Sequence, residues 1–121
     1  MDFVARSKEV FQVEINEIQR VANRIGDEVN QVVELIYAHT GKVVITGIGK
    51  TGIIGKKIAA SLASTGTQAI FINAAEALHG DLGIVSRGDV VIAISNSGES
   101  EEILNVVQTI KKLTCPLVAI T

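Results

Sequence analysis

Four apolar, strand-like runs alternate with helical segments after residue 40, and this alternation constrains the fold more than any other feature of the sequence. Each run is short and rich in Val, Ile and Ala. The predicted strands are residues 42–46, 68–72, 89–94 and 116–120, and helical segments are predicted at 53–64, 74–78 and 101–113. Strands that alternate with helices predict an α/β fold, a three-layer α-β-α sandwich around a mostly parallel, doubly wound sheet.

An amphipathic stripe precedes the predicted sheet. Apolar residues recur every three or four positions from Phe11 to Ile36, as on one face of a helix. Gly26 and Asp27 are suited to end one helix and to begin the next. We expect helices at roughly 5–25 and 27–39, packed either on the domain or on another subunit. The chain is predicted to be a single domain, residues 1–121, with helices in 1–40 and the parallel core in 41–121.

The composition and charge of the chain limit the classes of protein to which it can belong. Hydrophobic residues make up 47% of the chain and aromatic residues 3%, which suits an aliphatic core around a parallel sheet. The net charge of −2, without a basic run, gives no indication of a nucleic-acid or membrane partner. The single Cys115 excludes an internal disulfide framework. Neither a secretory signal nor a membrane span is recognised, so we expect a cytoplasmic protein.

A polar turn follows the third predicted strand. Ser95, Asn96, Ser97, Gly98 and Ser100 gather hydroxyl and backbone N–H groups where a strand turns into a helix. The positive end of a helix dipole favours an anion there, most simply a phosphate. An ordinary strand-to-helix turn with one serine as N-cap is the alternative, and three hydroxyl groups within six residues make it the weaker one.

A second, glycine-rich loop follows the first predicted strand. Residues 47–52 read Gly-Ile-Gly-Lys-Thr-Gly and match the dinucleotide pattern G-x-G-x-x-G. A dinucleotide site expects an acid at the end of the second strand, where Asn73 stands, and a P-loop expects a glycine at the position of Val44. The loop therefore offers N–H groups, the Lys50 ammonium and the Thr51 hydroxyl. We expect both loops to converge on one ligand with a phosphate at one end.

Four motifs together resemble the sugar isomerase (SIS) domain, and more narrowly the D-arabinose-5-phosphate isomerase family. They are Gly-Ile-Gly-Lys-Thr-Gly, Ala-Ser-Thr-Gly-Thr, Ala-Glu-Ala-Leu-His-Gly-Asp-Leu-Gly and Ser-Asn-Ser-Gly-Glu-Ser, within residues 40–121. The resemblance implies interconversion of D-ribulose 5-phosphate and D-arabinose 5-phosphate, a step towards the lipopolysaccharide sugar Kdo. It also implies a homotetramer, in which a pair of CBS modules follows the SIS domain.

The resemblance implies a role for each candidate residue. The phosphate is expected to contact Thr51, Ser95, Asn96, Ser97 and Ser100 and the backbone at Gly49 and Gly98, and the catalytic residues are expected to be Lys50, His79 and Glu102. Isomerisation through an enediol needs a base, a proton shuttle and positive charge at the developing oxyanion, which these side chains can supply. It needs no metal or cofactor, and we expect neither.

The last predicted strand ends at Thr121, where a doubly wound domain normally continues. We therefore expect an SIS domain that is incomplete at its C-terminus. The resemblance implies a further catalytic Glu and His outside the chain, so we expect little turnover by residues 1–121 alone. A non-catalytic phosphosugar sensor is the first alternative, although residues 1–40 contain no basic recognition helix. The other alternative is a structural fragment that self-associates through its N-terminal helices.

Overall fold

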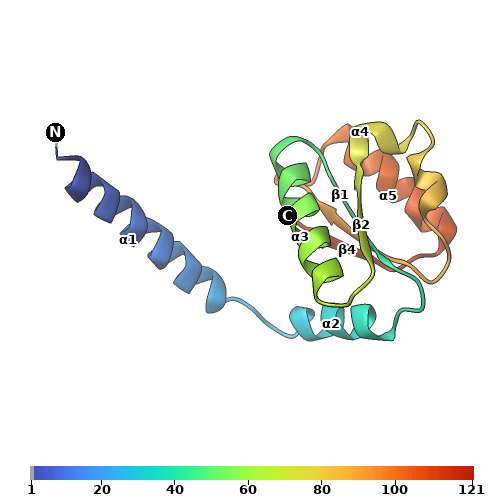
Figure 1. Ribbon diagram of the computed structural model, residues 1–121, viewed down its shortest axis with the longest axis horizontal. Coiled ribbons are helices and arrows are strands. Elements are labelled where there is room, and N and C mark those ends of the chain that lie inside the picture. Colours follow the sequence, from blue (N-terminus) through green and yellow to red (C-terminus); the bar gives the residue numbers. More distant parts are fainter. Residues whose placement is uncertain (1) are drawn as a thin grey trace. The chain divides into compact units, whose positions relative to one another are not determined.

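The computed structural model describes residues 2–121 and confirms the α/β class (Figure 1). The chain divides into two compact units, one that ends at Val33 and one from Glu34 to Thr121. The elements, in chain order, are α1 (Phe3–Ala22), α2 (Glu28–Ala38), β1 (Val43–Gly47), α3 (Gly49–Ser64), β2 (Ala69–Asn73), α4 (Ala74–Ala77), the 3₁₀ helix η1 (Asp81–Ile84), β3 (Val90–Ile94), α5 (Glu101–Leu113) and β4 (Leu117–Ile120).

The sheet has four strands in the order β2-β1-β3-β4, and every neighbouring pair is parallel. The register aligns Ile45 of β1 with Phe71 of β2 and with Ile92 of β3. The crossover through α3 leads from β1 to one edge strand, and the crossover through α5 leads from β3 to the other. The predicted strands are confirmed to within one residue at every end, because each apolar run is bounded by residues that do not extend it.

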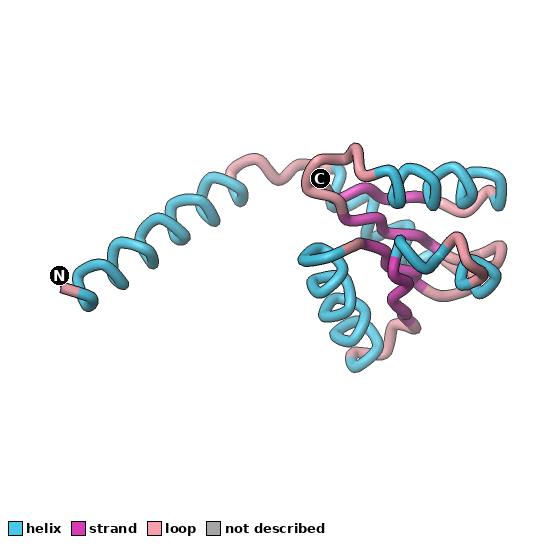
Figure 2. The backbone as a smooth tube through the Cα atoms, turned by 90° about the horizontal axis from the view of Figure 1, so that it is seen from above, coloured by secondary structure: helices cyan, strands magenta, loops and turns pink. Residues whose placement is uncertain are grey.

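The helices cover both faces of the sheet, as the tube view shows (Figure 2). All residues of β1 and β3 are buried, which is typical of parallel strands covered on two sides. One core cluster joins alternate sheet residues such as Val44 and Val91 to Ile103, Val106 and Ile110 of α5. A second cluster lies on the other face, and its members and close neighbours are Val43, Ile45, Ile92 and Ile94 from the sheet, Ile58, Ala59 and Leu62 from α3, and Ile36 from α2.

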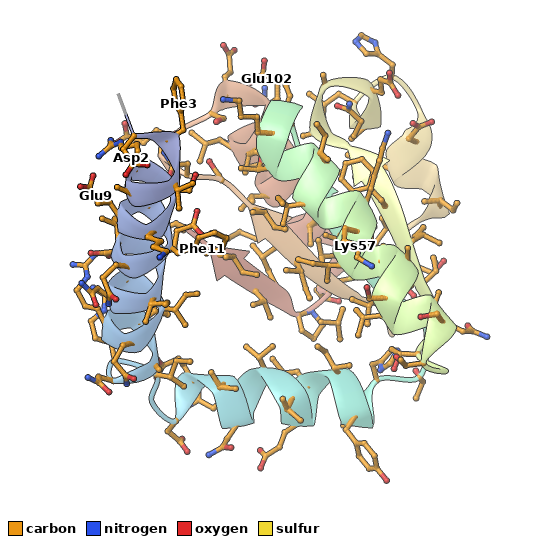
Figure 3. The ribbon with its side chains drawn as sticks, turned by 60° about the vertical axis from the view of Figure 1, so that its left-hand side comes forward. Asp2, Phe3, Glu9, Phe11, Lys57 and Glu102 are labelled. Atoms are coloured by element: carbon orange, nitrogen blue, oxygen red, sulfur yellow. The ribbon has the colours of Figure 1, made fainter. Side chains whose placement is uncertain are left out.

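The first unit, which ends at Val33, contains α1 and the first residues of α2. The Asp2 carboxylate caps α1 by accepting hydrogen bonds from the N–H groups of Val4 and Ala5 (Figure 3). The helix ends at Ala22 with Asn23 as its C-cap, so the prediction that Gly26 ends it is wrong. The apolar stripe runs on through Ile25, and its periodicity therefore gives no sign of the break.

Two further boundaries differ from the sequence-based expectation. Helix α3 begins at Gly49, four residues before the predicted start, because the glycine-rich stretch forms the first helical turn. Lys50 and Thr51 consequently belong to that turn. The segment after the short helix α4 contains the 3₁₀ helix η1, and no helix is predicted there from the sequence.

A buried ion pair joins the beginnings of the two central strands. The Asp89 carboxylate, before β3, accepts hydrogen bonds from the Lys42 ammonium at 2.7 Å, from the Lys42 N–H at 2.9 Å and from the Ser86 N–H at 2.8 Å. Burial by itself would raise the pKa of Asp89, and the hydrogen bonds and positive charge of Lys42 outweigh that effect, so the pKa lies below its ordinary value. This contact fixes β1 against β3 at the amino edge of the sheet.

Candidate functional site

The candidate site lies where the two crossovers diverge. Helix α3 leaves the carboxyl end of β1 and α5 leaves the carboxyl end of the neighbouring strand β3, and the two helices lead to opposite sides of the sheet. Ligands of open α/β sheets bind at this kind of switch point, beyond the carboxyl ends of the strands. The glycine-rich turn and the serine turn occupy that position, as the sequence predicted.

The glycine-rich turn is held by hydrogen bonds at the start of α3. The Thr51 hydroxyl donates to the carbonyl oxygen of Ile48 at 2.8 Å, and its oxygen accepts from the Ile48 N–H at 3.3 Å. Gly49 begins the helix with φ of +58°, a left-handed conformation that favours glycine. Lys50 follows in the first turn with an exposed side chain, and it forms no ion pair within residues 2–121. The ammonium is thus available to an anionic ligand.

The serine turn is held by its own hydroxyl groups. Ser95 is buried, and its hydroxyl oxygen accepts the Gly98 N–H at 3.0 Å and lies 3.4 Å from the Ser100 hydroxyl. Ser97 accepts the Glu99 N–H at 3.2 Å, and Gly98 has φ of +70°. The structure therefore brings Ser95 and Ser100 together. Asn96 and Ser97 are exposed beside them.

Helix α5 begins with an open N-terminus. Its N-cap residue, Ser100, makes no side-chain hydrogen bond to the first turn. The N–H groups of a first turn have no partner within their own helix, so those of Glu101 and Glu102 can donate to a ligand. The Glu102 side chain is half-buried at this end of α5 (Figure 3). The free N–H groups at the start of α5 and the Glu102 carboxylate are therefore adjacent in the chain.

The third segment at this edge follows β2. Asn73 caps α4 by accepting the Ala75 N–H at 2.9 Å, so the residue in the place of a dinucleotide-binding acid has a structural role. His79 comes two residues after the end of α4 and is exposed. Lys50, His79 and Glu102 thus follow three different strands in the chain, β1, β2 and β3. No hydrogen bond or ion pair joins any two of them within residues 2–121.

The Thr46 hydroxyl, which is buried near the site, is not among the candidate residues predicted from the sequence. Thr46 is the penultimate residue of β1, and its oxygen is buried without a hydrogen-bond partner among the described residues. Its neighbours in the sheet are Ile72 and Ala93. The signal that could have found it is a threonine that ends an otherwise aliphatic run.

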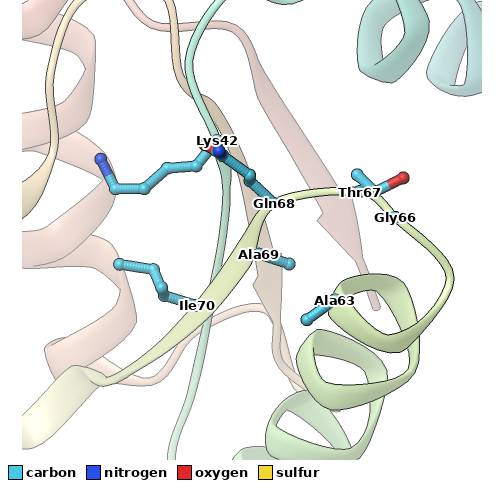
Figure 4. A pocket seen from close by; sticks show the side chains of 7 residues that line it. All are labelled: Lys42, Ala63, Gly66, Thr67, Gln68, Ala69 and Ile70. Atoms are coloured by element: carbon cyan, nitrogen blue, oxygen red, sulfur yellow. The ribbon is translucent and has the colours of Figure 1, made fainter.

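A separate hollow lies at the opposite edge of the sheet. It has a volume of about 380 Å³ and is bordered by Lys42, before β1, and by the turn that leads into β2 (Figure 4). The Lys42 ammonium is already paired with Asp89. Because this hollow lies at the amino ends of the strands, it is distinct from the two loops.

Residues 2–121 contain neither a metal-binding cluster nor a membrane-spanning helix. Three or more His, Cys, Asp or Glu side chains do not gather there in a way that could hold a metal ion. Within the same residues, each helix is too short or too polar to cross a membrane.

Comparison with known proteins places the chain in a known domain family. The family model described as the SIS domain matches residues 36–121. The arabinose 5-phosphate isomerase KdsD of Pseudomonas aeruginosa is 43% identical over all 121 residues, and that of Escherichia coli K12 is 46% identical over 120. The chain spans 37% of the length of each of these two relatives.

Solved structures agree with this placement. The protein c3406 of Escherichia coli CFT073, solved in complex with A5P, superposes with a TM-score of 0.92 at 41% identity, over 98% of this chain and 63% of that one. A putative sugar-phosphate isomerase of Listeria monocytogenes superposes with a TM-score of 0.91 at 31% identity, over 98% of this chain and 64% of that one.

Proposed function

The chain belongs to the SIS domain family, and we propose that it binds a sugar phosphate between its glycine-rich and serine turns. We propose further that it is part of an aldose–ketose isomerase. The reaction we propose is the interconversion of D-ribulose 5-phosphate and D-arabinose 5-phosphate. The names of the curated relatives and the A5P complex of the c3406 protein support this substrate. We extend the proposal to a cytoplasmic homo-oligomer on the route to Kdo.

The observation that carries the proposal is the open N-terminus of α5 beside the serine turn. Ser100 leaves the first-turn N–H groups without a side-chain cap, and the hydroxyl groups of Ser95 and Ser97 lie in the preceding turn. A phosphate dianion accepts hydrogen bonds from such groups and is favoured by the helix dipole. The further proposed contacts are Thr51 and the backbone at Gly49 and Gly98. They require the Thr51 hydroxyl to release the Ile48 carbonyl and the Gly98 N–H to release Ser95 when the phosphate binds.

The sugar carbons extend from the phosphate towards the three candidate catalytic side chains. Glu102 is the proposed base, and it removes the proton from C2 of arabinose 5-phosphate. The electrons form the C1–C2 double bond of an enediol while the C1 oxygen takes up a proton. Reprotonation at C1 and loss of the proton from the C2 hydroxyl then give the ketose, ribulose 5-phosphate.

Lys50 and His79 have the complementary roles. The Lys50 ammonium stabilises the negative charge that develops on the substrate oxygens, because it has no competing ion pair within residues 2–121. His79 moves protons between the C1 and C2 oxygens, and its exposed position after α4 leaves it accessible to substrate. Only protons are transferred, so the reaction requires no redox cofactor.

The test uses a chimera, because the chain spans 37% of the length of these relatives and the proposed activity is that of a whole enzyme. Residues 1–121 replace the matching residues of the Pseudomonas aeruginosa enzyme, and NMR follows the conversion of arabinose 5-phosphate into ribulose 5-phosphate. We expect isomerisation, reduced at least about 100-fold by Lys50→Met. Lys112→Met, which alters an exposed lysine of α5, is the matched control.

Two outcomes would contradict the proposal. A folded chimera that binds arabinose 5-phosphate without converting it would favour the sensor alternative. A Lys50→Met chimera that keeps the rate of the Lys112→Met control would remove Lys50 from the chemistry.

A further inference from the structure

The side chain of Asn73, the last residue of β2, carries hydrogen-bond donors that the fold does not use. An asparagine amide has one carbonyl oxygen, which accepts, and one NH₂ group, which donates twice. The Asn73 oxygen accepts the Ala75 N–H at 2.9 Å and so caps α4. The NH₂ group has no hydrogen-bond partner within residues 2–121, and the residue is only half-buried. The cap therefore leaves both donors of Asn73 available to a ligand.

The alternation of side chains along β2 places Asn73 on the side of the sheet that α3 covers. Ile70 and Ile72 pack with the first core cluster, on the side of α5, and Ala69 and Phe71 pack with the second cluster, on the side of α3. The backbone of Asn73 is still extended, with φ of −69° and ψ of 126°. Because side chains of a strand alternate between its two faces, Asn73 follows Phe71 on the side of α3.

The first turn of α3 is the helical segment beside Asn73. In the sheet, Asn73 pairs with Gly47, which comes two residues before that helix. Phe71 lies against the same helix, since a Cβ atom added at Gly52 would be 3.3 Å from its ring. Lys50 is nearer than Gly52 to the carboxyl edge of the sheet, just as Asn73 is nearer than Phe71. The free amide donors and the Lys50 ammonium thus belong to the same part of the proposed site.

The strand order relates Asn73 to the reacting end of the sugar. Strand β1 lies between β2 and β3, and neighbouring strands are about 4.8 Å apart, so the ends of β2 and β3 are about 10 Å apart. The proposed phosphate lies beyond β3, and an extended pentose 5-phosphate spans a similar distance. We propose that the Asn73 amide donates a hydrogen bond to the oxygen on C1 and, together with Lys50, stabilises the negative charge that develops there.

This inference rests on the proposed function and adds a contact at a stated atom of the substrate. The oxygen on C1 is the carbonyl oxygen of open-chain arabinose 5-phosphate and a hydroxyl oxygen of ribulose 5-phosphate. Both oxygens accept hydrogen bonds, so the same donor serves both directions of the reaction. The analogue 1-deoxy-D-ribulose 5-phosphate lacks this oxygen and keeps the phosphate, which separates the contact of Asn73 from the phosphate site.

The first measurement is the dissociation constant of each of these two ketose phosphates for the 121-residue chain, by ¹⁵N NMR titration. Asn73→Ser removes the amide donors and keeps an N-cap, because serine caps helices about as well as asparagine does. We expect it to raise the dissociation constant of ribulose 5-phosphate about tenfold and to leave that of the 1-deoxy sugar within about twofold. Asn30→Ser changes an exposed asparagine of α2 and is the matched control, which should alter neither constant.

The second measurement uses the wild-type chain and does not depend on the folding of a variant. The NH₂ signals of Asn73, assigned through its backbone, should shift with ribulose 5-phosphate and stay unchanged with the 1-deoxy sugar. The inference is overturned if these signals respond equally to both sugars, or if folded Asn73→Ser binds ribulose 5-phosphate as wild type does or weakens both sugars equally. A wild-type chain that binds neither sugar would overturn the proposed phosphate site, and this inference with it.

Discussion

Replacement of Asp89 by alanine should destabilise the fold severely, although this residue is distant from the proposed ligand. The Asp89 side chain is almost fully buried and accepts three hydrogen bonds, two from Lys42 and one from Ser86. The substitution leaves the Lys42 ammonium without a counter-ion and two backbone N–H groups without their acceptor. Loss of one partner of a buried pair costs about 3–5 kcal/mol, and Lys42 can turn partly to solvent, so we expect about 3 kcal/mol.

The assay is urea unfolding followed by circular dichroism, because the chain contains no tryptophan for fluorescence. A loss of about 3 kcal/mol is a large part of the stability of a small domain, about 5–15 kcal/mol. Asp81→Ala is the matched control, because Asp81 is an exposed aspartate of η1 and its loss should cost less than about 0.5 kcal/mol.

The stabilisation by Asp89 also depends on pH. Its pKa is lowered in the folded state, so its contribution is fully present above the unfolded pKa of about 3.9 and is lost as pH falls through the folded pKa. The difference between wild type and Asp89→Ala should therefore be largest at neutral pH and shrink below about pH 4. A difference under about 1 kcal/mol at pH 7 would refute the reasoning, because a buried pair that is broken costs more.

Two further substitutions test the strand and turn that border the site. Thr46→Val should leave stability unchanged or raise it by up to about 1 kcal/mol in urea unfolding, because it removes a buried hydroxyl without a partner; a loss above about 1 kcal/mol would reveal a hydrogen bond. Gly98→Ala should cost about 1 kcal/mol and weaken binding of arabinose 5-phosphate, because φ is +70° there; unchanged stability and affinity would show that the turn tolerates a side chain.

Most of the sheet could be predicted because its strands are distinct in the sequence. The runs that contain Val43–Gly47 and Val90–Ile94 are aliphatic, and both are buried on two sides. The positions of the two loops follow from the parallel order, since parallel strands end at one edge. The serine turn could likewise be recognised from its composition.

Other features depend on contacts that periodicity does not contain. The break after Ala22 is invisible in an apolar stripe that continues through Ile25. The start of α3 at Gly49 conflicts with the low helix propensity of glycine, and the Thr51 side chain stabilises that start by bonding to Ile48. The pair of Lys42 and Asp89 joins residues 47 positions apart, which no local pattern can indicate.

The central claim is that the serine turn and the start of α5 hold the phosphate of a sugar. The most direct measurement is an NMR titration of the ¹⁵N-labelled chain with D-arabinose 5-phosphate, and with unphosphorylated D-arabinose for comparison. We predict that the phosphorylated sugar shifts the amide signals of Ser97, Gly98, Glu101 and Glu102 and that D-arabinose leaves them unchanged at equal concentration. Equal shifts by both sugars, or shifts confined to the hollow near Lys42 and Gln68, would contradict the claim.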